Sequence, residues 1–256
     1  MKIHDKDFLD YLGMEERNIL ASIVNFRQEF DLFYNVDRIY REPLIRLTVS
    51  EDEAVVPQLY LFVHFHLYFS VSCILRSHLS EALSSARKAI DAALTAYVLI
   101  LKPEQATAYV NRDKYFQFIK GNVQNEITQN NSAYPLAREL LKIHDACSEF
   151  GSHADISSFF HRLETKTAPD NKTELLFHYF QFPRNPDEYR FHFLVVIQAF
   201  YLMFRIFKLF FDEKLKIIDP RWEGTIAQLG PTLDQRRQAA YERFQTTPNP
   251  TLNRTR

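Results

Sequence analysis

An arginine inside the apolar stripe of a helical segment is the best candidate for chemistry in this chain. At 100° per residue, the apolar residues between Leu79 and Leu101 fall within an arc of roughly 80°. Arg87 lies only about 50° from the centre of that arc, whereas Lys88 points to the opposite side. Asp91 follows Arg87 at i+4, so the two side chains can form an ion pair along the helix. Such an ion pair would lie where this helix packs against a second helix. In the alternative, Arg87 binds an anionic ligand or a carboxylate from another helix.

A second group of titratable side chains lies where a helix should end at Gly151. His144 and Cys147 share a helical face at i, i+3, and Ser152 and His153 follow the glycine directly. Two histidines and a cysteine raise the question of zinc, but a fourth ligand is absent and Cys147 also fits an apolar stripe. We therefore expect no metal and no cofactor.

The same segment supplies the expected partners of the arginine. We expect Ser152 and His153 to face Arg87 and Asp91 as one polar cluster, with His153 hydrogen-bonded where the chain leaves its helix. A nucleophilic Cys147 is disfavoured, because burial in a helix raises the pKa of a thiol. The sequence also lacks the motifs of phosphate-binding loops, dinucleotide folds, zinc proteases, α/β-hydrolases and dithiol redox proteins.

The net charge limits the classes of binding partner, and the two cysteines indicate the cellular compartment. Lys and Arg number 31 and Asp and Glu 32, so the net charge of −1 creates no global field that attracts nucleic acid or an anionic membrane. Nucleic acid stays open as a partner that the net charge does not support, since a local basic patch is compatible with this balance but is not implied by it. Cys73 and Cys147 lie in apolar settings, which indicates reduced, buried thiols in the cytoplasm, with a single disulfide as the alternative. The N-terminus carries acidic residues where a secretion signal would be apolar, which also predicts a cytoplasmic protein that is not secreted.

Composition and periodicity predict an all-α protein, a multi-helix bundle. Only 5 glycines accompany 23 phenylalanines and 13 tyrosines, which favours long elements with aromatic packing over a turn-rich sandwich or barrel. Leu59 to Leu75 alternates as a strand would, and on a strand His64 and His66 would share a face. We prefer a buried helix, on which these histidines lie about 200° apart. The expected helices are Met14 to Tyr40, Leu59 to Leu75, Ser80 as N-cap to Leu101, Glu104 to Asn111, Lys114 to Gln129, Pro135 to Phe150, Phe191 to Lys216 and Leu233 to Phe244.

The later part of the chain is punctuated by turn residues. A proline, an aspartate and an asparagine at 169–171 would form the turn of a short β-hairpin near 161–182. We expect residues 1–218 to form one helical bundle domain. Repeated glycines and prolines predict that 219–256 is an extension with a short helix and a disordered end.

Two apolar stretches, Ala54 to Leu75 and Phe191 to Phe211, approach the length that spans a bilayer. The first contains two histidines and several other polar side chains, and the second contains Arg205 and Lys208. Buried helices of a soluble aromatic core explain both better, so we expect no membrane contact.

The segment LRSHLSEALSSARKAIDAALTAYVLILKPEQ resembles uncharacterised all-helical prokaryotic families related to the HEPN superfamily. The shared features are an arginine followed four residues later by an acid, an aromatic-rich helix end and a proline. A later helix then ends in a Ser-His element, here Ser152-His153, before another long apolar helix. The resemblance covers Leu59 to Leu215 and implies an HEPN-like bundle that commonly dimerises, in defence, toxin–antitoxin or RNA-processing systems.

The active ribonucleases of that superfamily carry an arginine, four to six residues and then a histidine, a spacing that Arg138 and His144 match. A straight helix separates these two by about 120° and turns Arg138 to solvent, and Glu139 beside it would repel phosphate. We therefore favour a non-catalytic interaction or ligand-binding protein that self-associates, or binds a protein partner, through an exposed aromatic seam. The alternative is a metal-independent ribonuclease with His144 or His153 as acid/base, and Arg138 or Arg87 stabilising the phosphorane.

Overall fold

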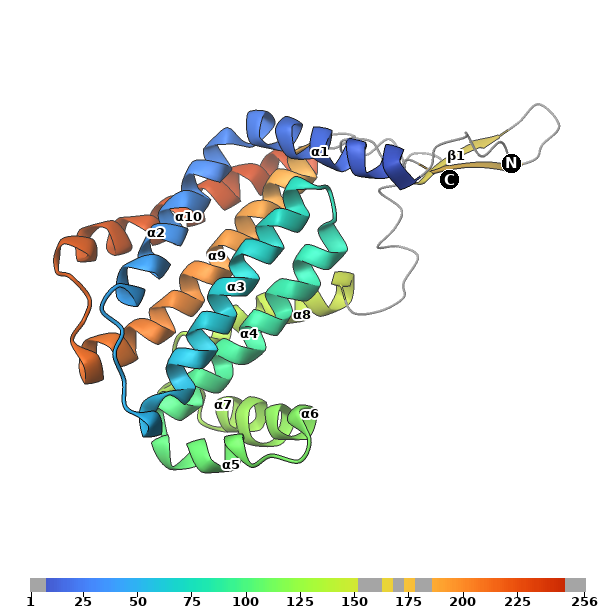
Figure 1. The fold of residues 1–256 in the computed structure, drawn as a ribbon. Helices are drawn as coiled ribbons and strands as arrows, with labels where there is room; N and C mark the ends of the chain where they lie inside the picture. Colours follow the sequence, from blue (N-terminus) through green and yellow to red (C-terminus); the bar gives the residue numbers. More distant parts are fainter. Residues whose placement is uncertain (1–7, 152–162, 168–172, 178–185, 247–256) are drawn as a thin grey trace.

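The computed structural model describes residues 8–151, 163–167, 173–177 and 186–246. Within these ranges the regular elements are helices apart from one pair of short strands, so the predicted all-α bundle is confirmed. The centre of the bundle consists of the long helices α3 (Val55–Leu75), α4 (Leu79–Leu101) and α9 (Pro186–Phe210), which pack on one another (Figure 1).

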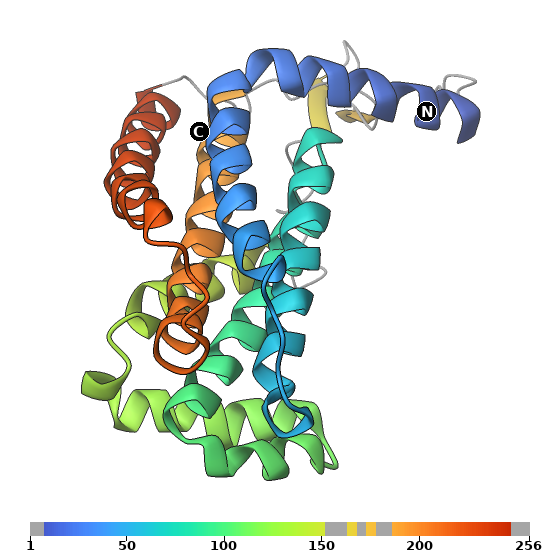
Figure 2. The same cartoon turned by 60° about the vertical axis from the view of Figure 1, so that its left-hand side comes forward.

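The remaining helices surround this centre. Helices α2 (Arg27–Leu44) and α10 (Arg221–Thr246) pack on α9, and α8 (Ala137–Gly151) packs on α4. Helix α1 (Phe8–Asn25) lies across one end of the bundle (Figure 2). At the opposite end gather α5 (Ala106–Val110), α6 (Tyr115–Phe118) and α7 (Asn125–Gln129).

Several short segments link these helices. A π-helical segment, Ile119–Gln124, joins α6 to α7, and another, Phe211–Leu215, continues α9. Single 3-10 turns lie at Glu51–Glu53, Pro103–Gln105 and Asn131–Ala133.

The predicted hairpin near 161–182 is confirmed. Strand β1 (Leu163–Thr167) pairs antiparallel with β2 (Thr173–Phe177), and the register places Thr165 opposite Leu175. The turn residues expected at 169–171, and the end of the chain from 247 onward, lie outside the described residues.

Helix α4 is buried on more than the one stripe that its sequence predicts. The predicted stripe is buried as expected, except that Leu101, at the end of the helix, is exposed. On its other sides α4 buries small residues, which allow the neighbouring helices to approach closely. These residues are Ala82, Ala89, Ala92, Ala93 and Ala96.

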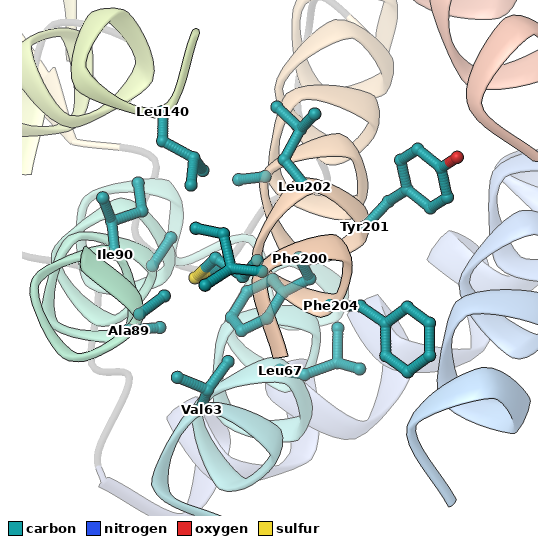
Figure 3. Packing of buried hydrophobic residues seen from close by; sticks show 14 of the residues in the cluster. Val63, Leu67, Ala89, Ile90, Leu140, Phe200, Tyr201, Leu202 and Phe204 are labelled. Atoms are coloured by element: carbon teal, nitrogen blue, oxygen red, sulfur yellow. The ribbon is translucent and has the colours of Figure 1, made fainter. Parts of the chain in front are cut away.

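Aromatic side chains tie the outer helices to α9, as the composition predicts. Tyr40 of α2 stacks on Tyr60 of α3, with ring centroids 5.3 Å apart and planes at 12°. The buried phenol of Tyr40 donates a hydrogen bond to the carbonyl of Phe200 at 2.8 Å, and that of Tyr60 donates to the carbonyl of Tyr40 at 2.6 Å. Each hydroxyl thus has the partner that burial requires. Figure 3 shows apolar side chains of α3, α4 and α8 gathered around α9. Among them are Val63, Leu67, Ile90 and Leu140, which surround Phe200 of α9.

In the part of the chain that the structure describes, two helices have the length and composition of a membrane span. They are Val55–Leu75 and Pro186–Leu215, and more than half of each apolar stretch is buried inside the bundle. Burial of this kind is the arrangement expected of core helices.

The single helix predicted from Met14 to Tyr40 is wrong, because the chain turns at Phe26. The backbone there adopts φ −112°, ψ 31°, which ends α1 and redirects α2 while Phe26 itself becomes completely buried. Helix α1 turns Asn18 and Ser22 inward, and the hydroxyl of Ser22 donates a hydrogen bond to the carbonyl of Leu75 at 2.9 Å. An inward polar face replaces the apolar face that the spacing predicts.

The short helix predicted from Leu233 to Phe244 is also wrong, since α10 runs unbroken from Arg221 to Thr246 through two glycines and Pro231. Its buried residues, Ile226, Leu229, Leu233 and Ala240, belong to the same core as α9. Packing on α9 outweighs the low helix propensity of the glycines and the proline.

Smaller differences concern helix starts. Helix α4 begins at Leu79, after His78, without a side-chain cap, so Ser80 is not the N-cap that the sequence predicts. Helix α8 starts at Ala137 instead of Pro135, and α9 starts earlier than predicted, at Pro186.

Candidate functional site

Arg87 lies at the contact between α4 and α8. Its side chain is half-buried, whereas that of Lys88 is exposed, which is the difference that the stripe geometry predicts. The Nε–H of Arg87 points to Nε2 of His144 on α8, at 3.4 Å. The same Nε2 lies 3.2 Å from Oδ1 of Asp91. The structure therefore joins Arg87, Asp91 and His144 into one cluster, which we call the Arg87 cluster.

The ion pair that the sequence predicts between Arg87 and Asp91 does not form. Within the part of the chain that the structure describes, the two charged groups do not come within ion-pair distance of each other, and His144 lies between them. The reason is the packing of α8 on α4, which inserts a buried imidazole between two side chains that are neighbours on one helix.

The other predicted site residues are placed as follows. Arg138 is exposed on α8 while His144 is buried, as expected from their separation of about 120°, so the structure does not bring them together. Ser152 and His153, predicted to face Arg87, lie outside the described residues. Among the residues that the structure describes, no three His, Cys, Asp or Glu side chains converge as metal ligands would.

The two contacts of His144 make different demands on its ring nitrogen Nε2. Its Nε2 can accept a hydrogen bond from Arg87 only when it is unprotonated, and it can donate to Asp91 only when it is protonated. The hydrogen bond that the geometry supports is the one from Arg87, so Nε2 of His144 is the acceptor. Oδ1 of Asp91 is then a buried acceptor without a hydrogen-bond partner, which costs about 1–3 kcal/mol. The other ring nitrogen, Nδ1, faces the exposed Asp145 at 3.5 Å.

Two neighbours of the Arg87 cluster, Cys147 and Tyr115, are neutral at pH 7. Burial raises the pKa of Cys147 to about 12, although Arg87 opposes the shift, so this thiol is no nucleophile. Burial, with contributions from Tyr109 and Asp91, raises the pKa of Tyr115 to about 12. The guanidinium of Arg112 lies over the rings of Tyr109 and Tyr115, at 4.0 Å and 5.0 Å from their centroids.

A second polar cluster, which sequence reasoning missed, connects α2 to α3. Asp37, buried on α2, accepts from the phenol of Tyr68 at 2.6 Å and contacts Nε2 of His64 at 3.1 Å. Its other oxygen pairs with Nε of Arg41 at 2.9 Å. Burial lowers the pKa of His64 despite the opposing effect of Asp37, so His64 is neutral at pH 7. The available signal was a pair of i, i+4 spacings, Asp37 with Arg41 and His64 with Tyr68.

The preferred helical interpretation of Leu59 to Leu75 is confirmed by the two histidines of α3. His64 faces Asp37 on α2, whereas His66 faces α4, where its Nδ1 lies 2.7 Å from the hydroxyl of Ser85. The two imidazoles thus serve different helix contacts and do not form a common site.

The outer side of α3 carries the exposed aromatic seam that the sequence analysis anticipates. Five large apolar side chains there are between 43% and 60% exposed. Their spacing places them within an arc of roughly 120° on one helix face. They are Leu61, Phe62, Phe65, Tyr68 and Phe69, which we call the α3 aromatic face.

Comparison with protein-family models, with curated proteins and with solved structures finds no match for this chain.

Proposed function

We propose that this chain is a non-catalytic, HEPN-like helical interaction protein that pairs with a second copy of itself through the α3 aromatic face. The observation that carries the proposal is that face, five large apolar side chains exposed side by side on one helix. A contiguous apolar surface rimmed by polar residues is typical of a protein interaction site, and aromatic side chains are enriched at such sites.

Charge favours a second copy as the occupant. From 54 to 75 the chain has no Asp, Glu, Lys or Arg, so two identical faces can meet without opposing like charges. Arg41, near the Tyr68 end of the face, is already paired with Asp37. The net charge of −1 gives whole molecules little mutual repulsion. The resemblance to HEPN-related families adds a dimeric, cytoplasmic protein of a defence, toxin–antitoxin or RNA-related system to the proposal.

Light scattering across a concentration series tests the proposal. The wild-type mass should rise above 30.3 kDa toward twice that value. The Phe65→Glu variant should remain at the monomer mass, because two buried carboxylates would face each other in the pair. The matched control is Phe116→Glu, which changes an even more exposed phenylalanine at the α6 end of the molecule and should leave pairing intact. A wild-type protein that stays monomeric at every concentration refutes the proposal.

A second candidate function is a metal-independent ribonuclease, and the contact between Arg87 and His144 favours it. A guanidinium beside an imidazole combines the groups that a phosphodiester cleavage would use, one to stabilise charge and one to move a proton. Incubation with mixed RNA in EDTA should then show cleavage that His144→Ala and Arg87→Ala abolish and Arg138→Ala leaves unchanged. His153→Ala tests the remaining acid/base candidate. Absence of cleavage by the wild type removes this function and leaves the pairing proposal standing.

A further inference from the structure

A polar hollow lies at the end of the bundle where α5, α6 and α7 gather. It has a volume of about 250 Å³ and is lined by residues of two helical segments. One segment is the end of α4 with the following turn, which contributes Val98, Lys102 and Gln105 at i, i+4 and i+7. The other is the π-helical segment with α7, which contributes Asn122, Asn125 and Gln129 at i, i+3 and i+7.

An ion pair spans the hollow and fixes the distance between the two segments. Nζ of Lys102 lies 2.6 Å from Oε1 of Glu126, which also accepts from Asn130 at 3.0 Å and from Tyr134 at 3.1 Å. Val98 is buried and supplies apolar surface. The walls are therefore held in place before any ligand enters, which lowers the entropic cost of binding.

Four carboxamides line the hollow, and their side chains make no hydrogen bond to other described residues, so they are free to meet a ligand. Gln105 is half-buried, and the other three, Asn122, Asn125 and Gln129, are exposed at the rim. Each carboxamide offers two donors and an acceptor, so the lining can match a ligand that both donates and accepts at several points. Two of them flank or lie within a π-helical segment, a local distortion that is frequent at functional sites.

The chemistry of the lining selects among ligand classes. Lys102 and Glu126 neutralise each other, so the hollow has no net charge with which to attract an anion or a cation. No aromatic side chain lines it, so it offers no stacking surface for a nucleobase. Hydroxyl groups, like carboxamides, donate and accept at the same time. We propose that this hollow binds a small neutral polyhydroxylated ligand of the size of one sugar ring.

Saturation-transfer NMR on the full chain tests the proposal with glucose, galactose and N-acetylglucosamine as neutral probes. Glucose 6-phosphate and adenosine are the charged and aromatic comparisons. At least one neutral sugar should bind saturably, and should bind more tightly than either comparison. Asn125→Leu combined with Asn122→Leu should weaken that binding at least about tenfold, because two bidentate contacts are lost. Gln117→Leu, an exposed carboxamide on α6 outside the hollow, should leave it unchanged.

Three results would overturn the proposal. They are no saturable signal with any of the three sugars, preferential binding of glucose 6-phosphate or adenosine, and unchanged sugar binding in the double variant. Circular dichroism of that variant shows whether it is folded. If it is not, Gln105→Leu, which changes the other wall, replaces it with the same expected loss.

Discussion

Asp37 receives contacts from three side chains on two helices, Arg41 on its own helix and His64 and Tyr68 on α3. A buried carboxylate is tolerated only when such donors replace the water that it loses. The pairing of Arg87 with His144 follows the same rule, since a half-buried guanidinium requires a nearby acceptor. At both positions a polar side chain on one helix is satisfied from another helix, so each contact also fixes how the helices pack.

Asp37→Asn should lower the free energy of unfolding by about 1–3 kcal/mol, measured in urea. The amide keeps the shape of the side chain, but its NH₂ group faces donors that need an acceptor. Asp31→Asn, an exposed position on the same helix, is the matched control and should change stability by less than about 0.5 kcal/mol. Equal effects of the two substitutions would show that the Asp37 contacts do not stabilise the fold.

Stability should fall as the pH drops through about 6.5. Burial lowers the pKa of His64 and of His66 below the ordinary value of 6.5, and Lys88 adds to the effect at His66. The unfolded chain therefore takes up protons at a higher pH than the folded protein does, and acid favours unfolding. The contribution is complete above about pH 6.5 and is lost toward the lowered folded pKa values. Urea unfolding between about pH 8 and 5 should show this decline, and His64→Gln with His66→Gln should flatten it; an unchanged slope contradicts the assignment.

At the scale of elements, α1 and α10 depart most from what their residues favour locally. Helix α1 turns polar residues inward and exposes Leu20, Ile23 and Val24. Helix α10 continues through Gly230 and Pro231 because its apolar face packs on α9. Gly230 has a specific reason to be glycine, since a Cβ at this position would lie 2.8 Å from the hydroxyl of Tyr201.

Two glycine substitutions in α10 should have opposite effects on thermal and urea stability. Gly230→Ala should destabilise the protein by about 1–3 kcal/mol, because the methyl group displaces the Tyr201 ring, whose hydroxyl donates to the carbonyl of Ile226 at 2.8 Å. Gly224→Ala should stabilise it by about 0.5–1 kcal/mol, since a Cβ there meets no atom within 4 Å and alanine favours a helix. If both substitutions stabilise, Tyr201 does not constrain α10.

At the scale of the whole molecule, the bundle closes around α9 and leaves the α3 aromatic face outside. Both cysteines are buried and unpaired, Cys73 on α3 and Cys147 on α8, so the disulfide alternative is not realised. Their reactivity therefore depends on opening of the folded structure, because a buried thiol with a raised pKa neither ionises nor meets reagents.

Thiol labelling with an aromatic disulfide reagent at about pH 8 should be slow in the native protein. Burial raises the pKa of Cys73 to about 11 and that of Cys147 to about 12. In guanidinium chloride, without reductant, both thiols should react at once. Rapid labelling of the native protein would contradict their burial, and absent thiols in the denatured protein would indicate a disulfide.

The sequence by itself determined much of the helical architecture and the character of individual positions. Apolar spacing identified α4, α8 and α9 to within a few residues, and placed Arg87 half in the core and Arg138 in solvent. These properties are local, because the face on which a helical residue lies follows from the 100° turn per residue.

Only the tertiary structure decided which polar groups meet and where local signals are overruled. His144 lies 57 residues from Arg87 in sequence, and no local spacing reveals that α8 will present it to α4. The break at Phe26, the continuity of α10 and the contacts of Asp37 likewise depend on which helix faces pack together. Burial between helices offsets unfavourable propensity and satisfies buried charge, and it exists only once the whole bundle has formed.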